Sequence, residues 1–388
     1  MAIKPSKRSI VYFDAQVLLG EKTGVGYFCH TLIAQLAAVM PETRFVGHAY
    51  DFMLRSKADL PKASNISYVR NPFLPIQFVN LLRRFRVEIP LELRIFRRAA
   101  MALHLNYLSV PSLFRTPAIG FIYDMCFVDH PEFVSKKNRQ DLTRFVPDTL
   151  RRCSHIVTIS NFTAERLRNN YPTYSNDMII LPIPPAPAAD ITATLSDRLI
   201  DLGVRSKKYV LYIGTLEPRK NIVGLVRAYK CLSEKIRAEY SLVLAGGKGW
   251  NDEDTQATIQ EAEDAGLQVI RTGYVSQFEK IALYRHAACF VLPSHYEGFG
   301  MPIFEAMQQN IPVAVTDIPV FHEVAGDAAI YFKQTDPTDI TKILTKLLAD
   351  DALRQTLIQK GQERLTGFSW SANIRTMQSL LDSMLRTR

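Results

Sequence analysis

The chain has 388 residues, of which 47% are hydrophobic and 22% are charged. This composition excludes a disordered protein, and the length predicts two domains of roughly 200 residues or somewhat fewer. The 47 lysines and arginines exceed the 38 acidic residues, which gives a net charge of +9. Such a charge predicts an anionic partner, and a nucleotide, a membrane surface and a nucleic acid all fit it.

The cysteines and the apolar segments indicate the compartment. The five cysteines lie far apart without a C-x-x-C pair, so a disulfide framework and a zinc cluster are both disfavoured. The apolar stretch near the start contains Asp14 and Gln16, which favours a first strand over a signal peptide. No segment reaches the ~18 apolar residues of a membrane span. We therefore expect a cytoplasmic protein.

Short apolar segments alternate with helical patterns along the whole chain. In the first half the expected strands lie within residues 9–18, 44–50, 66–71, 101–105, 117–124, 155–160 and 178–184. In the second half they lie within residues 209–215, 241–247, 268–275, 289–294, 311–318 and 328–332. Strands that are apolar on both faces and separated by helices predict parallel sheets covered on both sides, so we expect two doubly wound α/β domains.

A proline-rich stretch, "LPIPPAPAADITATL" at 181–195, predicts an extended connector between the domains. The expected domains are 1–186 and 187–368, followed by a helix over 369–388 with one apolar side. Because ligands of open α/β sheets bind at the carboxyl ends of the strands, a ligand is expected in a cleft between the two domains.

The stretch "SHYEGFGMPIFEAM" at 294–307 follows an expected strand and opens a helix near Pro302. The backbone amides around the helix start form a candidate phosphate site, because they point at the loop together with the positive end of the helix dipole. The residues of this candidate site are Gly298, Phe299, Gly300 and Met301.

Two glutamates flank that turn. Glu297 precedes it and can reach a hydroxyl-rich group beside the phosphate. Glu305, expected in the first full turn of the helix, can accept two hydroxyl hydrogen bonds, as from a ribose diol. The alternative is structural, since Glu305 could complement the helix dipole and Glu297 could cap a turn.

Two further candidate sites also follow expected strands. In "YIGTLEPRKN" at 212–221 a strand runs into Gly214, and Arg219 and Lys220 can neutralise a diphosphate without a metal. The alternative is a solvated cation pair. In "EKTGVGYF" at 21–28, Gly24 and Gly26 permit close approach of the backbone to a phosphate or sugar.

Asp124, at the end of the strand in "FIYDMCFVDHPEF", can orient or deprotonate an acceptor hydroxyl, or it can cap a turn. The acidic run Asp252-Glu253-Asp254 imitates a metal-binding D-x-D, but its position favours a helix N-terminus. The eight histidines show no metal-ligand spacing, so no bound metal is expected.

The segment 78–101 carries six arginines and two glutamates among apolar residues. This pattern predicts a basic amphipathic surface for anionic lipid, with a solvated helix face as the alternative. Nucleic-acid binding is not expected, because no recognised nucleic-acid motif accompanies the charge.

Taken together, the motifs resemble those of family 4 glycosyltransferases of the GT-B fold. The resemblance rests on five stretches that span nearly the whole chain: "TGVGYF", "ISNFTAERL", "GTLEPRKN", "EGFGMPIFE" and "PVAVTDIPVFHEVAGDAAIYF". It implies two Rossmann-like domains facing a central cleft, an N-terminal one for the acceptor and a C-terminal one for the donor. It also implies a last helix that packs back on the first domain, and a retaining transferase that uses a nucleotide-diphosphate sugar without metal or other cofactor.

The resemblance also implies roles for single residues. Glu297 would contact the donor sugar and Glu305 the ribose, while Arg219 and Lys220 would bind the diphosphate. The backbone of Gly26 would bind phosphate, and the backbone near Tyr274 would hold the base. One position departs from the family pattern, because Tyr123 stands before Asp124 where members often have a histidine that contacts sugar or acceptor.

The likeness is greatest to bacterial transferases of polysaccharide and O-antigen assembly. It implies transfer of mannose from GDP-mannose to a saccharide or lipid-linked acceptor. The basic segment 78–101 would suit a lipid-linked acceptor at the inner membrane face, so we expect a cytoplasmic protein that can lie on that face. The alternatives are a UDP-sugar transferase, a sugar-nucleotide epimerase of the same fold, and a non-catalytic protein that binds membrane or nucleic acid.

Overall fold

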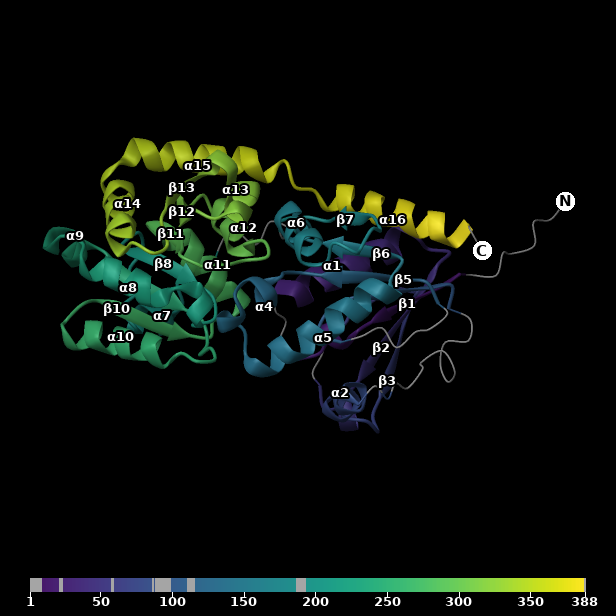
Figure 1. Ribbon diagram of the computed structural model, residues 1–388. Helices are drawn as coiled ribbons and strands as arrows, with labels where there is room; N and C mark the ends of the chain where they lie inside the picture. Colours follow the sequence, from purple (N-terminus) through teal and green to yellow (C-terminus); the bar gives the residue numbers. More distant parts are fainter. Residues whose placement is uncertain are drawn as a thin grey trace. The chain divides into compact units, whose positions relative to one another are not determined.

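The computed structural model describes residues 9–20, 24–56, 59–85, 87, 99–109, 116–185 and 193–386. The chain forms two compact units, Met1–Pro182 with Trp370–Arg388 and Ile183–Ser369, called unit 1 and unit 2 below (Figure 1). The first segment of unit 1 ends at Pro182, four residues before the predicted boundary at residue 186. Half of the basic segment 78–101 and part of the connector lie outside the described residues.

Unit 1 is built on a parallel sheet with the strand order β3-β2-β1-β4-β5-β6-β7 in the part of the chain that is described. Each strand falls inside a segment predicted from the sequence, because a buried strand leaves an apolar run, although the edge strands β3 and β7 are only half-buried. The strands are β1 (Ile10–Asp14), β2 (Arg44–Tyr50), β3 (Ile66–Asn71), β4 (Met101–His104), β5 (Ala118–Ile122), β6 (His155–Thr158) and β7 (Met178–Ile180).

Helices cover this sheet. They are α1 (Gly24–Val39), α2 (Ile76–Arg84), α4 (Cys126–Asp129), α5 (Lys136–Arg152), α6 (Asn161–Asn170) and α16 (Trp370–Arg386), with the short 3-10 helices η1 (Gln16–Leu18), η2 (Phe52–Leu54) and η3 (Pro131–Phe133). Ser135 and Ser160 begin α5 and α6 by accepting a backbone N–H, as N-cap residues do.

The last helix, α16, belongs to unit 1. The ring of Trp370 stacks on Phe28 of α1, with 5.6 Å between the ring centroids. The amide of Asn373 donates to the carbonyl of Pro182 at 2.6 Å, which fastens α16 to the end of the unit's own chain.

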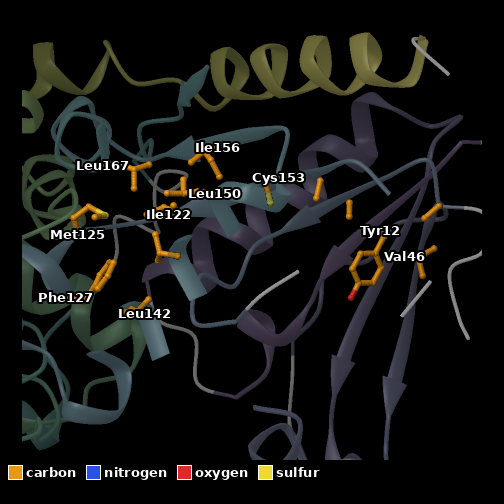
Figure 2. Close-up of a cluster of buried hydrophobic side chains, with 14 residues drawn as sticks. Tyr12, Val46, Ile122, Met125, Phe127, Leu142, Leu150, Cys153, Ile156 and Leu167 are labelled. Atoms are coloured by element: carbon orange, nitrogen blue, oxygen red, sulfur yellow. The ribbon is translucent and has the colours of Figure 1, made fainter. Parts of the chain in front are cut away.

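A buried cluster joins the sheet to its helices in unit 1 (Figure 2). Ile122 of β5 and Ile156 of β6 are fully buried, and Leu150 of α5 packs with them. Gly120 permits this approach, because a Cβ there would lie 2.8 Å from Thr149. The cluster therefore fixes β5, whose carboxyl end carries Asp124.

Unit 2 has a second parallel sheet, with the described strands in the order β10-β9-β8-β11-β12-β13. The strands are β8 (Tyr209–Ile213), β9 (Ser241–Ala245), β10 (Val269–Gly273), β11 (Cys289–Leu292), β12 (Val313–Thr316) and β13 (Ala329–Phe332). The chain runs outward from β8 through β9 to β10 and then returns to β11 on the other side of β8. This reversal makes the carboxyl ends of β8 and β11 the switch point at which α/β sheets bind ligands.

The remaining elements of unit 2 are helical. They are α7 (Asp197–Asp201), η4 (Pro218–Lys220), α8 (Ile222–Lys230), α9 (Glu234–Glu239), α10 (Glu253–Asp264), α11 (Gln277–His286), α12 (Met301–Gln308), α13 (Pro319–Ala325), η5 (Gly326–Ala328), α14 (Pro337–Ala349) and α15 (Asp351–Leu365). The acidic run that imitates D-x-D opens α10, with Glu253 and Asp254 in its first turn, as the sequence predicted. Among the residues described, no helix is both long and apolar enough to cross a bilayer.

Candidate functional site

The candidate site lies at the switch point of unit 2, where two loops meet. One loop follows β8 and contains η4, and the other joins β11 to α12. The backbone N–H of His295 donates to the carbonyl of Arg219 at 2.8 Å, so the two loops are bonded to each other. Glu297 and the two cations, predicted from separate motifs, are thereby brought together.

Glu297 accepts hydrogen bonds from both predicted cations. Arg219 Nη1 lies 3.1 Å from one carboxylate oxygen, and Lys220 Nζ donates to the other. Ser294 Oγ donates to that second oxygen at 2.9 Å. Burial opposes ionisation of Glu297, but Lys220 and Arg219 outweigh it and hold the pKa of this carboxyl below its usual range. The carboxylate is therefore ionised at neutral pH.

A second carboxylate, which the sequence reasoning missed, holds Arg219 from the other side. Glu217 Oε1 accepts from Arg219 Nε at 3.0 Å and from Nη2 at 2.8 Å. The indole N–H of Trp250 donates to the other oxygen of Glu217 at 3.1 Å. The signal was available, because Glu217 stands in the same motif as the cations.

Glycines shape the floor of the site. Gly214, which follows β8, and Gly246, which follows β9, have φ of +156° and +150°. A Cβ on Gly246 would lie 2.0 Å from the carbonyl oxygen of Gly214, so the two loops touch backbone to backbone. The hydroxyl of the buried Tyr212 donates to the carbonyl of Thr215 at 3.0 Å and braces the turn from below. Gly214 is also a predicted donor-binding residue, and its contact with a donor stays a prediction.

The start of α12 lies where the sequence predicted. Gly300 is the N-cap with φ of +106°, and α12 begins at Met301 with Pro302 in its first turn. The amides of the first turn and the helix dipole make this end attractive to an anion. Phe299, however, is 3% exposed and packs edge-on against Phe304, so its side chain belongs to the core. Gly298 lies in the same buried loop.

Glu305 lies further along α12 than expected. It is the fifth residue of the helix, and the first turn contains no acidic residue, which corrects the first-turn prediction. Its carboxylate accepts from Lys280 Nζ at 2.6 Å and from the buried hydroxyl of Tyr284 at 3.0 Å, both on α11. Glu305 is thus fixed in orientation, although it neither caps the helix nor complements its dipole.

Tyr274 follows β10 and is 69% exposed. The preceding Gly273 has φ of +66° and turns the chain at the strand's end. Contact of this backbone with a base stays a prediction.

In unit 1 the glycine motif differs from expectation. Helix α1 begins at Gly24, so Gly24 and Gly26 lie in its first turn and not in a loop before it. Gly26 is buried. Residues 21–23 of the motif lie outside the described residues.

Asp124 lies two residues beyond the end of β5, and its carboxylate accepts the backbone N–H of Cys126 at 3.2 Å. The side chain of Tyr123 points into the protein, where its hydroxyl donates to the carbonyl of Leu105 at 2.8 Å and lies 3.1 Å from Cys29 Sγ. Burial raises the pKa of Tyr123 well above its usual value. This tyrosine therefore packs the core and does not replace the histidine that family members present to sugar or acceptor.

The described part of the chain contains no group of three or more His, Cys, Asp or Glu side chains arranged to hold a metal ion. The chemistry that the site offers comes from two cations, the carboxylates of Glu217, Glu297 and Glu305, and a helix start, all within unit 2.

Two Rossmann-like units, each built on a parallel sheet, define a GT-B glycosyltransferase fold. The sucrose-phosphate synthase of Thermosynechococcus elongatus shares it with a TM-score of 0.73 at 17% identity, covering 98% of this chain and 100% of that one. WaaG, a glycosyltransferase involved in lipopolysaccharide biosynthesis, matches with a TM-score of 0.70 at 12% identity, covering 96% of this chain and 99% of its own.

The sequence comparisons identify the family. Residues 201–364 match the model of the glycosyl transferases group 1. The "O-antigen chain mannosyltransferase B" of Escherichia coli is 30% identical over 387 residues, which cover 93% of this chain and 96% of that protein. The "O-antigen chain mannosyltransferase RfbU" of Salmonella typhimurium is 29% identical over 188 residues, covering 48% of this chain and 49% of its own. The chain belongs to the group 1 glycosyltransferase family and is a glycosyltransferase.

Proposed function

We propose that the protein is a retaining, metal-independent mannosyltransferase that uses GDP-mannose and acts in O-antigen assembly. The sugar would pass to a saccharide or lipid-linked acceptor at the cytoplasmic face of the inner membrane. The choice of sugar and pathway rests on the Escherichia coli relative, which is named an O-antigen chain mannosyltransferase and matches this chain over 96% of its length.

One observation carries the chemistry: a buried carboxylate, Glu297, joins two adjacent cations at the switch point of the sheet. When a donor binds, Arg219 and Lys220 would neutralise its diphosphate, which is the group that must leave. Two positive charges at this position can supply the charge stabilisation that a metal ion supplies elsewhere, so the proposal needs no metal.

In the proposed step the acceptor hydroxyl attacks the anomeric carbon from the face that the diphosphate leaves. The new C–O bond forms as the bond from the anomeric carbon to the diphosphate oxygen breaks, through an oxocarbenium-like state. A diphosphate oxygen takes the acceptor proton, and the nucleoside diphosphate departs. Glu297 would hold sugar hydroxyls, Glu305 the ribose, and Asp124 the acceptor hydroxyl.

The proposal is tested with purified protein, a panel of GDP-mannose, UDP-glucose and other nucleotide sugars, and a mannose-terminated acceptor. We expect transfer from GDP-mannose that persists in EDTA, with an α-linkage by NMR. Transfer from a UDP-sugar alone would reject the donor, and an inverted anomeric centre would reject the mechanism. Release of an epimerised sugar without acceptor would instead identify an epimerase.

Variants separate the site from the fold. Arg219→Ala and Glu297→Ala are each expected to lower kcat/KM by at least about a hundredfold, which is typical for loss of one preorganised charge at a transition state. A matched control is Arg237→Ala, which removes an arginine of α9 on the same unit. Full activity in both site variants would reject the assignment.

A further inference from the structure

Unit 1 exposes a concentration of large apolar side chains in one region. Of the fifteen large hydrophobic side chains that are exposed among the described residues, eight lie between residues 52 and 87. We call these eight the apolar patch: Phe52, Met53, Leu54, Phe73, Phe78, Leu81, Phe85 and Val87. Scattered single exposed hydrophobics are ordinary, whereas a set of this size marks an interaction surface.

Backbone hydrogen bonds hold two parts of the patch together. The N–H of Met53 in η2 donates to the carbonyl of Pro72 at 3.0 Å, immediately before Phe73. The N–H of Asp51 donates to the carbonyl of Asn71 at 2.9 Å. Figure 1 shows α2 near the ends of β2 and β3, where η2 and the turn before α2 also lie.

The helical part of the patch forms a stripe. Phe78 and Leu81 of α2 are spaced i and i+3, which puts them on one side of the helix, and Phe85 follows directly after its last residue, Arg84. All three are exposed, while Val79 is 3% exposed and packs inward. The helix thus has an apolar side toward solvent as well as one toward the protein.

The exposure of η2 is built into the fold. Met53 and Leu54 have φ of +57° and +52°, a conformation that is unfavourable for such side chains. The loop is nonetheless held firmly, because the buried carboxylate of Asp51 accepts from Arg70 Nε at 2.6 Å and from the N–H of Ser56 at 3.1 Å. The strained backbone keeps two apolar side chains outward, where they gain nothing from the core.

We infer that the apolar patch docks on the surface of an anionic lipid bilayer. Aromatic and aliphatic side chains that protrude singly from a turn and a short helix suit the headgroup and acyl boundary, and Phe73 is 82% exposed. The charge is complementary to such a surface: the chain carries +9, Arg55 beside η2 is exposed, and the sequence from 83 to 98 has six arginines and two glutamates.

The location connects the patch with the acceptor. Because β2, β3 and β5 are parallel members of one sheet, η2, the turn before α2 and Asp124 all follow carboxyl ends of its strands. Docking this part of unit 1 on a bilayer would keep a lipid-linked acceptor close to the residues proposed to receive it. This link to the acceptor rests on the proposed function, whereas binding to lipid does not.

The test is flotation with vesicles of phosphatidylethanolamine and phosphatidylglycerol, using the full chain. We expect the wild type to float, and the double variant Phe73→Ser/Phe85→Ser to bind at least about tenfold less, because two exposed phenylalanines no longer insert. The control variant Ile200→Ser/Phe278→Ser removes two exposed hydrophobics of unit 2 and should float like the wild type. Failure of the wild type to float, or equal binding by the patch variant, would overturn the inference.

Two further measurements keep the result unambiguous. Phe73→Trp is expected to float like the wild type and to show a blue shift of its new tryptophan fluorescence when vesicles are added. Sedimentation shows whether a second copy covers the patch, since a wild-type dimer that the serine variant abolishes would overturn lipid docking. Transfer to a water-soluble acceptor should be unchanged in the serine variant, so an inactive wild type that still floats would reject only the proposed function.

Discussion

Replacing Glu297 by glutamine tests the charge cluster most directly. The substitution preserves shape and removes the negative charge that Arg219 and Lys220 share. Arg219 keeps a second ion-pair partner in Glu217, so the substitution weakens the ion pairing of Lys220 more than that of Arg219. Lys220 is also the less exposed of the two cations, at 13% against 19% of the side chain.

The expected loss of unfolding free energy follows from the burial of the ion pairs. Removing one partner of a fully buried ion pair costs about 3–5 kcal/mol. Because both cations retain some exposure and Glu217 remains, we expect a loss of about 2–3 kcal/mol, which corresponds to a fall of roughly 5–10 °C in the melting temperature of unit 2. A matched control is Glu239→Gln, which breaks an exposed pair with Lys208 and should change the melting temperature little.

The response to ligand is the diagnostic part of this prediction. If the diphosphate of GDP binds Arg219 and Lys220 as proposed, Glu297 of the wild type competes with it for these cations, and GDP has to displace an internal partner. In Glu297→Gln the cations lack that partner, and saturating GDP should raise the melting temperature more than it does in the wild type. Transfer should nevertheless fall, because the proposed sugar contact is lost. The reasoning would be refuted if GDP raised the melting temperature of Glu297→Gln less than that of the wild type, or if the variant kept the transfer activity of the wild type.

Three other predictions address the surroundings of the site. Gly246→Ala should destabilise unit 2 by more than about 3 kcal/mol, because its Cβ would collide with the carbonyl of Gly214, whereas Gly247→Ala has open space and should be close to neutral in thermal unfolding. The hydrogen bonds of Glu279 to Ser276, Arg198 and Ser196 overcome the cost of its burial and lower its pKa to about 2. The stabilisation from this carboxylate is therefore complete above pH 4.5 and lost toward pH 2, so the difference in unfolding free energy between wild type and Glu279→Gln should shrink over that range. Trp250→Phe removes one hydrogen bond to the carboxylate that holds Arg219, and kinetic assays should show KM for the donor raised several-fold with a smaller change in kcat. An unchanged KM would show that the indole has no positioning role.

The sequence was most informative about the sheets. Strand β2 coincides with its predicted segment and is buried along almost its whole length, as a parallel strand covered on both faces should be. Strand β3 also coincides with its predicted segment, although it is a half-buried edge strand. The glycine turn before α12 was predictable for a similar reason, since Gly300 and Pro302 are local signals of a helix start.

Partnerships between distant residues were not predictable in the same way. Glu305 pairs with Lys280 and Tyr284 because α11 packs beside α12, and nothing in the spacing of these residues along the chain encodes that. Phe299 was assigned to the ligand through its backbone, which stays a prediction, whereas the inward turn of its side chain against Phe304 was not foreseen. Such orientations depend on the packing of the whole unit, which a local pattern does not contain.

The internal carboxylates give a physical reason for selecting a diphosphate. Before any donor binds, Arg219 is held by Glu217 and Glu297, and Lys220 by Glu297. An incoming anion must therefore attract Arg219 and Lys220 more strongly than the carboxylates that already bind them. This competition favours a ligand with more negative charge. We predict that GDP stabilises the wild type far more than GMP does, and that this preference is smaller in Glu297→Gln, where the competing charge is absent. Thermal-shift titrations of GDP and GMP with the wild type and with Glu297→Gln measure this preference. An equal preference in the two proteins would show that shape, and not charge, selects the ligand.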